Sequence, residues 1–167
     1  MKRIKVLQYI CPQNETARRT LAVLFWLLSV ACAVCIFWLS GRDGTDSELM
    51  SNEMRGFLAK LLGSLPGSFM VRKGAHFLEY TALAFFVSSA LFLTARRFMP
   101  TVSLIASVLY CVSDEIHQYF VPGRACRIFD VGVDTLGALT GILAFALAVA
   151  VINSAVFRRS QNFPEKI

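Results

Sequence analysis

The sequence predicts an all-α integral membrane bundle of four transmembrane helices, with a short amphipathic helix between the first and second spans. Hydrophobic residues make up 56% of the 167 positions and include 14 phenylalanines, which is more than a typical soluble domain carries. About 20 apolar residues, each adding about 1.5 Å, cross a hydrocarbon core of about 30 Å. Four stretches are long enough to do so: 20–39, 77–95, 98–120 and 131–157.

The first of these stretches is expected to stay in the mature protein as a membrane anchor. Its apolar run is longer than the roughly 7–15 apolar residues of a secretory signal peptide, and the segment before it is unusually long. We therefore count it as a span.

The segment between the first two spans, 41–71, contains the features of a helix. Thr45 and Glu48 have the spacing of a capping box, and Gly63-Ser64-Leu65-Pro66-Gly67 is a stop signal. Between these two signals, five apolar residues recur at helical spacing: Met50, Met54, Phe57, Leu58 and Leu61. We expect an amphipathic helix on the outer membrane surface, either as a linker resting on lipid or as a lid over a polar site.

Lysine and arginine favour cytoplasmic segments close to the spans, and this bias gives the orientation. Ten of the 17 basic residues lie in segments 1–19, 96–97 and 158–167, and the other seven lie on the opposite side of the predicted membrane. We therefore expect a cytoplasmic tail at 1–19, a membrane domain at 20–157 and a second cytoplasmic tail at 158–167. This orientation accounts for the net charge of +6, which gives no reason to expect nucleic acid as a partner.

With both termini in the cytoplasm, every polar cluster of the membrane domain falls near the extracytoplasmic face. Ionisable side chains at membrane depth are costly, so such clusters indicate a site. The candidate ligand-binding residues are Arg72, Lys73, His76, Glu79, Tyr80, Asp114, Glu115, Gln118, Arg124, Asp130 and Asp134.

Helical spacing orients the last of these clusters. Asp130 and Asp134 share a helix face with Gly137 and Gly141, because these positions follow at intervals of four, three and four. Two glycines four apart allow another helix to approach closely in a membrane. The two carboxylates are therefore predicted to face the interior of the bundle.

Two arginines, Arg124 and Arg127, lie in the loop before the last span, next to these carboxylates. Arginine presents a planar fork of donors that suits carboxylate or phosphate groups. The arginines either neutralise the acids or leave binding capacity for an anionic headgroup.

The residue types also suit catalysis. His76, Glu79, Asp114 and Glu115 are candidates for acid–base chemistry. A divalent cation such as Mg²⁺ or Mn²⁺ would take oxygen ligands, although no established metal signature is present and the cofactor stays unknown. The candidate metal ligands are Glu79, Asp114, Glu115, Asp130 and Asp134. Alternatively, arginines and carboxylates pair only to fix the helices relative to one another.

Several spaced motifs in 71–141 resemble the VanZ-like family: Arg72-Lys73-x-x-His76-Phe77-x-Glu79-Tyr80, Asp114-Glu115-x-x-Gln118, Gly123-Arg124 and Asp130-x-x-x-Asp134-x-x-Gly137. The resemblance is looser after the first span, where this chain reads Ser40-Gly41-Arg42. It implies a small multi-pass protein of the bacterial plasma membrane, in a family named for an association with teicoplanin resistance.

Three classes of function follow from the residues and the resemblance. The first is a protein whose outward polar pocket engages a cell-envelope component, such as a lipid-linked cell-wall precursor or a glycopeptide, and so contributes to glycopeptide tolerance. The alternative is a membrane-embedded acid–base or metal-dependent enzyme acting on a lipid-linked envelope precursor. Transport is the third, and it is the least favoured, because four spans form only a thin pathway. The lipid bilayer is an expected partner in each case, and the sequence does not give the oligomeric state.

Overall fold

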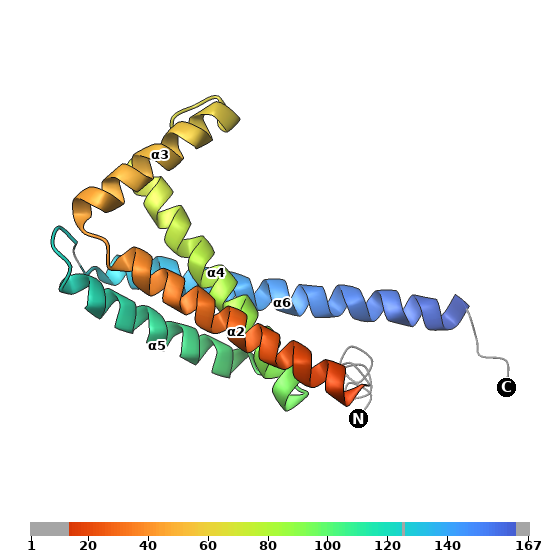
Figure 1. Ribbon diagram of the computed structural model, residues 1–167. Helices are drawn as coiled ribbons and strands as arrows, with labels where there is room; N and C mark the ends of the chain where they lie inside the picture. The colour runs from red at the N-terminus through yellow and green to blue at the C-terminus, as the bar shows by residue number, and fades with distance from the viewer. Residues whose placement is uncertain (1–13, 125, 163–167) are drawn as a thin grey trace.

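The computed structural model describes residues 14–124 and 126–162, and within these residues all secondary structure is helical (Figure 1). The predicted all-α class is confirmed. Positions 1–13 and 163–167, which hold most of one predicted tail and the end of the other, lie outside the described residues. The helices are α2 (Glu15–Ser40), α3 (Gly44–Leu62), α4 (Ser68–Ala95), α5 (Pro100–Tyr119) and α6 (Ile128–Asn162).

Three of the helices are long and apolar enough to cross a membrane: α2, α4 and the Ile128–Ala155 part of α6. The remaining predicted span, 98–120, corresponds to α5, which is 20 residues long and does not reach the same apolarity. Its last two turns contain the polar residues Asp114, Glu115, His117 and Gln118. Length and composition thus support a membrane protein with three crossing helices.

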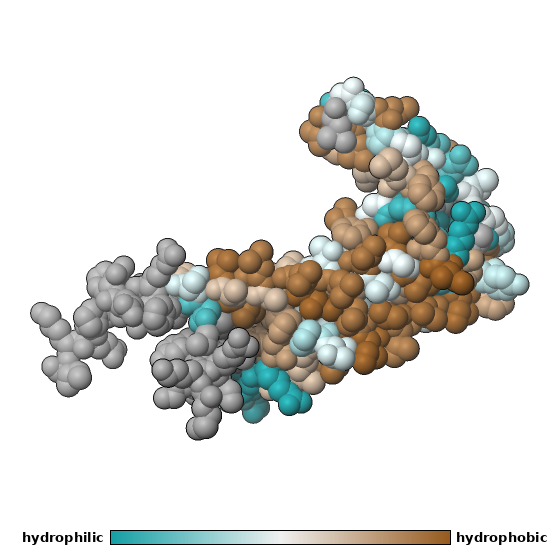
Figure 2. All heavy atoms as spheres, turned by 180° about the vertical axis from the view of Figure 1, so that it is seen from behind, coloured by the Kyte–Doolittle hydropathy of each residue, from teal (hydrophilic) through white to brown (hydrophobic). Residues whose placement is uncertain are grey.

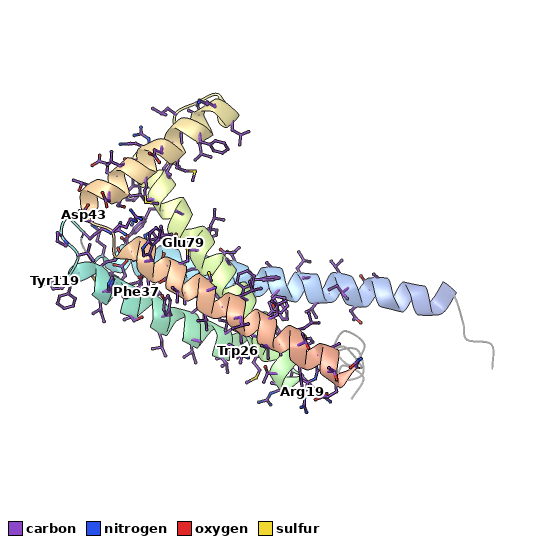
Figure 3. The ribbon with its side chains drawn as sticks, viewed as in Figure 1. Arg19, Trp26, Phe37, Asp43, Glu79 and Tyr119 are labelled. Atoms are coloured by element: carbon purple, nitrogen blue, oxygen red, sulfur yellow. The ribbon has the colours of Figure 1, made fainter. Side chains whose placement is uncertain are left out.

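The amino-terminal end of α2 lies against the carboxyl-terminal end of α4. Glu15 pairs with Arg19 (3.0 Å) on its own helix and with Arg96 just after α4. The Arg18 guanidinium donates to the carbonyl oxygen of Leu93, which lies in the last turn of α4. This basic end of the bundle, where Figure 3 labels Arg19, is opposite the end where Asp43 lies.

Helix α3 begins earlier than the predicted capping box. The N-cap is Asp43, whose carboxylate accepts a hydrogen bond from the Asp46 N–H (2.8 Å), so the prediction of Thr45 as the cap is wrong. This bond and the Thr45 hydroxyl hold the pKa of the Asp43 carboxyl below its usual value. The predicted stop signal is confirmed, because α3 ends at Leu62 and Gly63 follows with a left-handed φ of 70°.

Helices α4 and α6 approach at backbone distance, as the paired glycines predict. A Cβ on Gly137 would lie 2.4 Å from the Phe77 carbonyl oxygen, and one on Gly141 would lie 2.1 Å from that of Thr81. The Thr81 hydroxyl is 3.0 Å from the Gly137 carbonyl oxygen and connects the two helices. Only a residue without a side chain fits at these two positions of α6.

The apolar interior is divided between the two ends of the bundle. Near the polar end, a cluster forms around Tyr80 and Cys111; near the basic end, another forms around Phe92 and Phe145. Apolar residues also cover much of the outer surface of the helices, while hydrophilic residues gather around α3 and its junction with the bundle (Figure 2). A surface of this kind suits a lipid environment.

The glycine contact gives a stability prediction. Gly141→Ala inserts a methyl group against the Thr81 backbone, and overpacking of this kind lowers the free energy of unfolding by about 1–3 kcal/mol. Gly132→Ala, on the same helix, meets no atom within 4 Å and serves as the matched control. Unfolding of the two purified variants in detergent measures the difference. Equal stability would show that α4 and α6 do not depend on this contact.

Candidate binding site

The polar end of the bundle joins α2 to α5 through a buried hydrogen-bonded group. The Ser40 hydroxyl donates to Asp114 Oδ2 (2.9 Å), and the Gln118 amide donates to the same oxygen (3.0 Å). These three residues are 1–3% exposed. The Tyr80 hydroxyl of α4 is an electrostatic neighbour of Asp114, although it does not reach hydrogen-bond geometry. Helices α2, α4 and α5 therefore meet at one carboxylate.

Charged and titratable groups of α4 face the carboxylates of α6. Lys73 Nζ lies 2.5 Å from Asp130 Oδ1, and His76 Nδ1 lies 3.7 Å from Asp134 Oδ1. Asp134 is fully buried and its other oxygen accepts from the Cys111 thiol (3.4 Å). His76 Nδ1 and Asp134 Oδ1 make no hydrogen bond to any described residue. Buried polar atoms of this kind usually have a partner, which can be water or a ligand.

Glu115 holds the loop between α5 and α6. Its carboxylate accepts from the backbone N–H of Arg127 (3.0 Å) and is 2% exposed as a residue. This bond holds the backbone of the loop against α5, and the Arg127 side chain belongs to the lining of the polar cavity described below.

The same loop is in contact with the start of α3. The Gly44 N–H donates to the Pro122 carbonyl oxygen (3.0 Å), and a Cβ on Gly44 would lie 2.6 Å from the Gly123 oxygen. Arg124 donates to the Ser47 hydroxyl (3.0 Å). Helix α3 is therefore tethered over the polar end at its first turn.

The Arg124 guanidinium is partly buried, and burial lowers its pKa from the usual value, opposed mainly by Asp114. An arginine pKa is so high that the group still carries its charge at neutral pH. Its Nε atom has no hydrogen-bond partner among the described residues. Arg124 is thus a charged group with an N–H donor that no described residue accepts.

Two cavities open at this end and share Arg72, His76 and Arg124. The first, of about 200 Å³, is mainly polar and is lined by Phe69, Arg72, Lys73, His76, Gln118, Gly123, Arg124, Arg127 and Asp130. The second, of about 230 Å³, lies between α3 and α4 and is lined by Leu39, Ser40, Ser47, Met50, Ser51, Met54, Val71, Arg72, Ala75, His76, Glu79 and Arg124. Each is larger than the 10–15 Å³ or so that a single water needs.

The predicted site residues differ in their surroundings. Glu79 lines the second cavity, and Figure 3 places it near the end of the bundle where Asp43 lies. Asp114, Glu115 and Asp134 lie buried beneath the cavities and line neither of them. Within the described residues, no three histidine, cysteine, aspartate or glutamate side chains form a group that could hold a metal ion. Four of the five candidate metal ligands instead have other partners: Asp114 contacts Ser40 and Gln118, Glu115 a backbone N–H, Asp130 Lys73, and Asp134 Cys111 and His76.

Three polar partners of the predicted site residues escaped the sequence analysis: Ser40, Ser47 and Cys111. Ser40 and Ser47 are partners of Asp114 and Arg124, and Cys111 is a partner of Asp134. The one available signal was that Ser40 ends an otherwise apolar span.

A protein-family model described as VanZ/LLP1 matches residues 25–150. This range contains all of the predicted site residues and both cavities. Among curated proteins and among solved structures, nothing matches the chain.

The Ser40–Asp114 bond can be tested by its effect on stability. Ser40→Ala leaves a buried carboxylate oxygen with one donor fewer, which lowers the free energy of unfolding by about 1.5–3 kcal/mol. Ser113→Ala removes an exposed hydroxyl from α5 and is the matched control, expected to change stability by less than about 0.5 kcal/mol. Denaturant unfolding in detergent compares the two. If both variants unfold like wild type, the bond does not hold α2 to α5.

Proposed function

The chain belongs to the VanZ/LLP1 family, and we propose that it is a multi-pass plasma-membrane protein whose extracytoplasmic polar pocket engages a cell-envelope component and thereby contributes to glycopeptide tolerance. One observation carries the proposal: two cavities at the polar end meet at the charged residues Arg72 and Arg124. A closed structural cluster of ion pairs would leave no such space.

The proposed topology has four spans, with α5 as the third and both termini in the cytoplasm of a bacterial cell. The two faces of α5 support this assignment. Its buried face carries Ser103, Ser107, Cys111, Asp114, Glu115 and Gln118, whereas its exposed face carries Val102, Ile105, Leu109, Val112 and Ile116. A helix with its polar side turned inward and its apolar side outward can lie in lipid despite a moderate mean hydropathy.

In the same topology, α3 lies at the outer membrane surface and covers the pocket. Its apolar residues Phe57 and Leu61, which line neither cavity, are 62% and 70% exposed in the isolated molecule, so lipid would bury them. The tether between Arg124 and Ser47 supports the lid hypothesis over a free linker.

The pocket has the charge to receive an anionic group. Four basic residues line the polar cavity, namely Arg72, Lys73, Arg124 and Arg127, against one carboxylate, Asp130, which is paired with Lys73. Lipid-linked cell-wall precursors and glycopeptides both present charged groups to the outer leaflet. These are the two ligand classes proposed for the site.

One observation favours the enzymatic alternative. His76 Nδ1 and Asp134 Oδ1 face each other at 3.7 Å without other partners, an arrangement in which a carboxylate can orient a histidine that accepts or donates a proton. The candidate reaction is acid–base chemistry on a lipid-linked envelope precursor, with or without a divalent cation.

The proposed function predicts a phenotype. Arg124→Gln, Glu79→Gln and Asp114→Asn should lower teicoplanin tolerance in a common host, with the protein still present in the membrane. Arg97→Gln removes a charge from an exposed arginine outside the pocket and should leave tolerance unchanged. Susceptibility and membrane abundance are measured together. Loss of abundance in all three variants, two at the cavities and one at the buried Asp114, would favour purely structural ion pairs, and no tolerance from the wild-type protein would overturn the proposal.

The enzymatic alternative predicts turnover. Purified protein would release phosphate from farnesyl pyrophosphate, and His76→Gln would slow this release by about a hundredfold, as expected for loss of general acid–base catalysis. Addition of EDTA separates metal-dependent from metal-independent release. The same rate in wild type and His76→Gln would eliminate His76 as the acid or base.

A further inference from the structure

The two cavities differ in chemical character and meet along one line of charged residues. The cavity under the α5–α6 loop is polar, whereas the groove between α3 and α4 has apolar walls at Leu39, Met50, Met54 and Val71. A ligand that fills both must therefore be charged at one end and apolar at the other.

Resting on the proposed function, we infer that the ligand is a phosphate-bearing lipid, with its phosphate between Arg72 and Arg124 and its hydrocarbon chain in the groove between α3 and α4. This assignment names a chemical class for the envelope component. It also gives α3 a role as the wall that contacts the chain of the lipid.

The phosphate position follows from the two arginines. Arg72 and Arg124 both line each of the two cavities, and the charge of Arg72 is one of the causes that lower the pKa of the Arg124 guanidinium. Arg124 uses one terminal nitrogen on Ser47, and its Nε has no partner in the described part of the chain. A phosphate placed between two guanidinium groups relieves their repulsion and accepts charge-assisted hydrogen bonds from both. Glu79 lines the groove but not the polar cavity, so among the described residues the polar cavity itself has only one carboxylate, Asp130.

The position of the hydrocarbon chain follows from the residues of α3 that line the groove. Met50 and Met54 are one helical turn apart and both line the groove. Methionine is unbranched and flexible, so it packs against hydrocarbon chains of varied shape. Both side chains are at least 41% exposed in the free molecule and would be covered by a bound chain. A soluble phosphate would leave these surfaces uncovered, which is why a lipid fits better.

The test uses the purified full-length protein in dodecyl maltoside, a detergent without phosphate. Radiolabelled lysophosphatidic acid is the probe, because it joins one acyl chain to a phosphate. Two competitors divide its chemistry: a monoacylglycerol with the same chain and no phosphate, and glycerol 3-phosphate with no chain. We expect saturable binding that each competitor displaces at least tenfold less well than unlabelled lysophosphatidic acid.

Variants then locate each part of the ligand. Arg124→Gln should weaken binding of the probe by about tenfold or more, the size expected for a hydrogen bond between charged groups. Arg124→Lys should lose less, and the thermal unfolding midpoint of both variants checks that they remain folded. Arg97→Gln is the matched control outside the cavities and should bind like wild type.

Two neighbouring residues of α3 test whether the hydrocarbon chain of the lipid lies in the groove. Met50 lines the groove, whereas the adjacent Leu49 does not and is 64% exposed. Met50→Ser should weaken binding of lysophosphatidic acid by about fivefold, because an apolar contact is lost. The affinity for glycerol 3-phosphate, which has no hydrocarbon chain, should stay unchanged. Leu49→Ser should bind like wild type.

Specific outcomes overturn the inference. Equal competition by the monoacylglycerol would mean an apolar groove without a phosphate site, and equal competition by glycerol 3-phosphate would mean a site for a soluble anion. If wild type does not bind the probe but Arg124→Gln still loses teicoplanin tolerance, the lipid assignment fails and the proposed function stands. If wild type binds the probe but Arg124→Gln does not change teicoplanin tolerance, the proposed function fails and the lipid assignment stands.

Discussion

The close contact between the backbones of α4 and α6 determines how the rest of the molecule is arranged. Gly137 and Gly141 allow the carbonyls of Phe77 and Thr81 to approach to distances that a side chain would forbid. The two helices run in the same direction from the polar end, and this contact sets their register. One turn nearer the polar end, the same register places His76 opposite Asp134, and a second turn on it places Lys73 opposite Asp130. A wider separation would take Lys73 away from Asp130 and His76 away from Asp134.

The buried carboxylates explain why the polar end is ordered although it carries many charges. Asp114, Glu115 and Asp134 are each at most 2% exposed, and each accepts a hydrogen bond from a different helix or loop. Breaking such an arrangement is costly, whereas its net contribution to stability is small. Its value is specificity, because it fixes which residues surround the cavities. The arginines remain at the rim, where an anionic ligand can reach them.

Sequence patterns predicted the helices and the convergence of polar groups better than they predicted the contacts. Long apolar runs and the spacing of Gly137 and Gly141 are local signals, and the structure follows them. Helix α4 nevertheless begins at Ser68, well before the predicted span at 77–95, because Arg72 and Lys73 stay helical next to protein rather than lipid. The pairing of His76 with Asp134 depends on helix register, which no single segment encodes. Ser40 and Ser47 were missed because a serine looks the same whether it faces solvent or a buried charge.

Contact between Gly44 and Gly123 has a consequence for how the protein is made. These residues are far apart in sequence, and their backbones touch only when the first half of the chain meets the loop before the last helix. Contacts of this kind form late, since the intervening chain must first be ordered. The site takes side chains from all five described helices, so an incompletely inserted chain lacks it. The complete arrangement of these side chains therefore forms only after the last helix is in place.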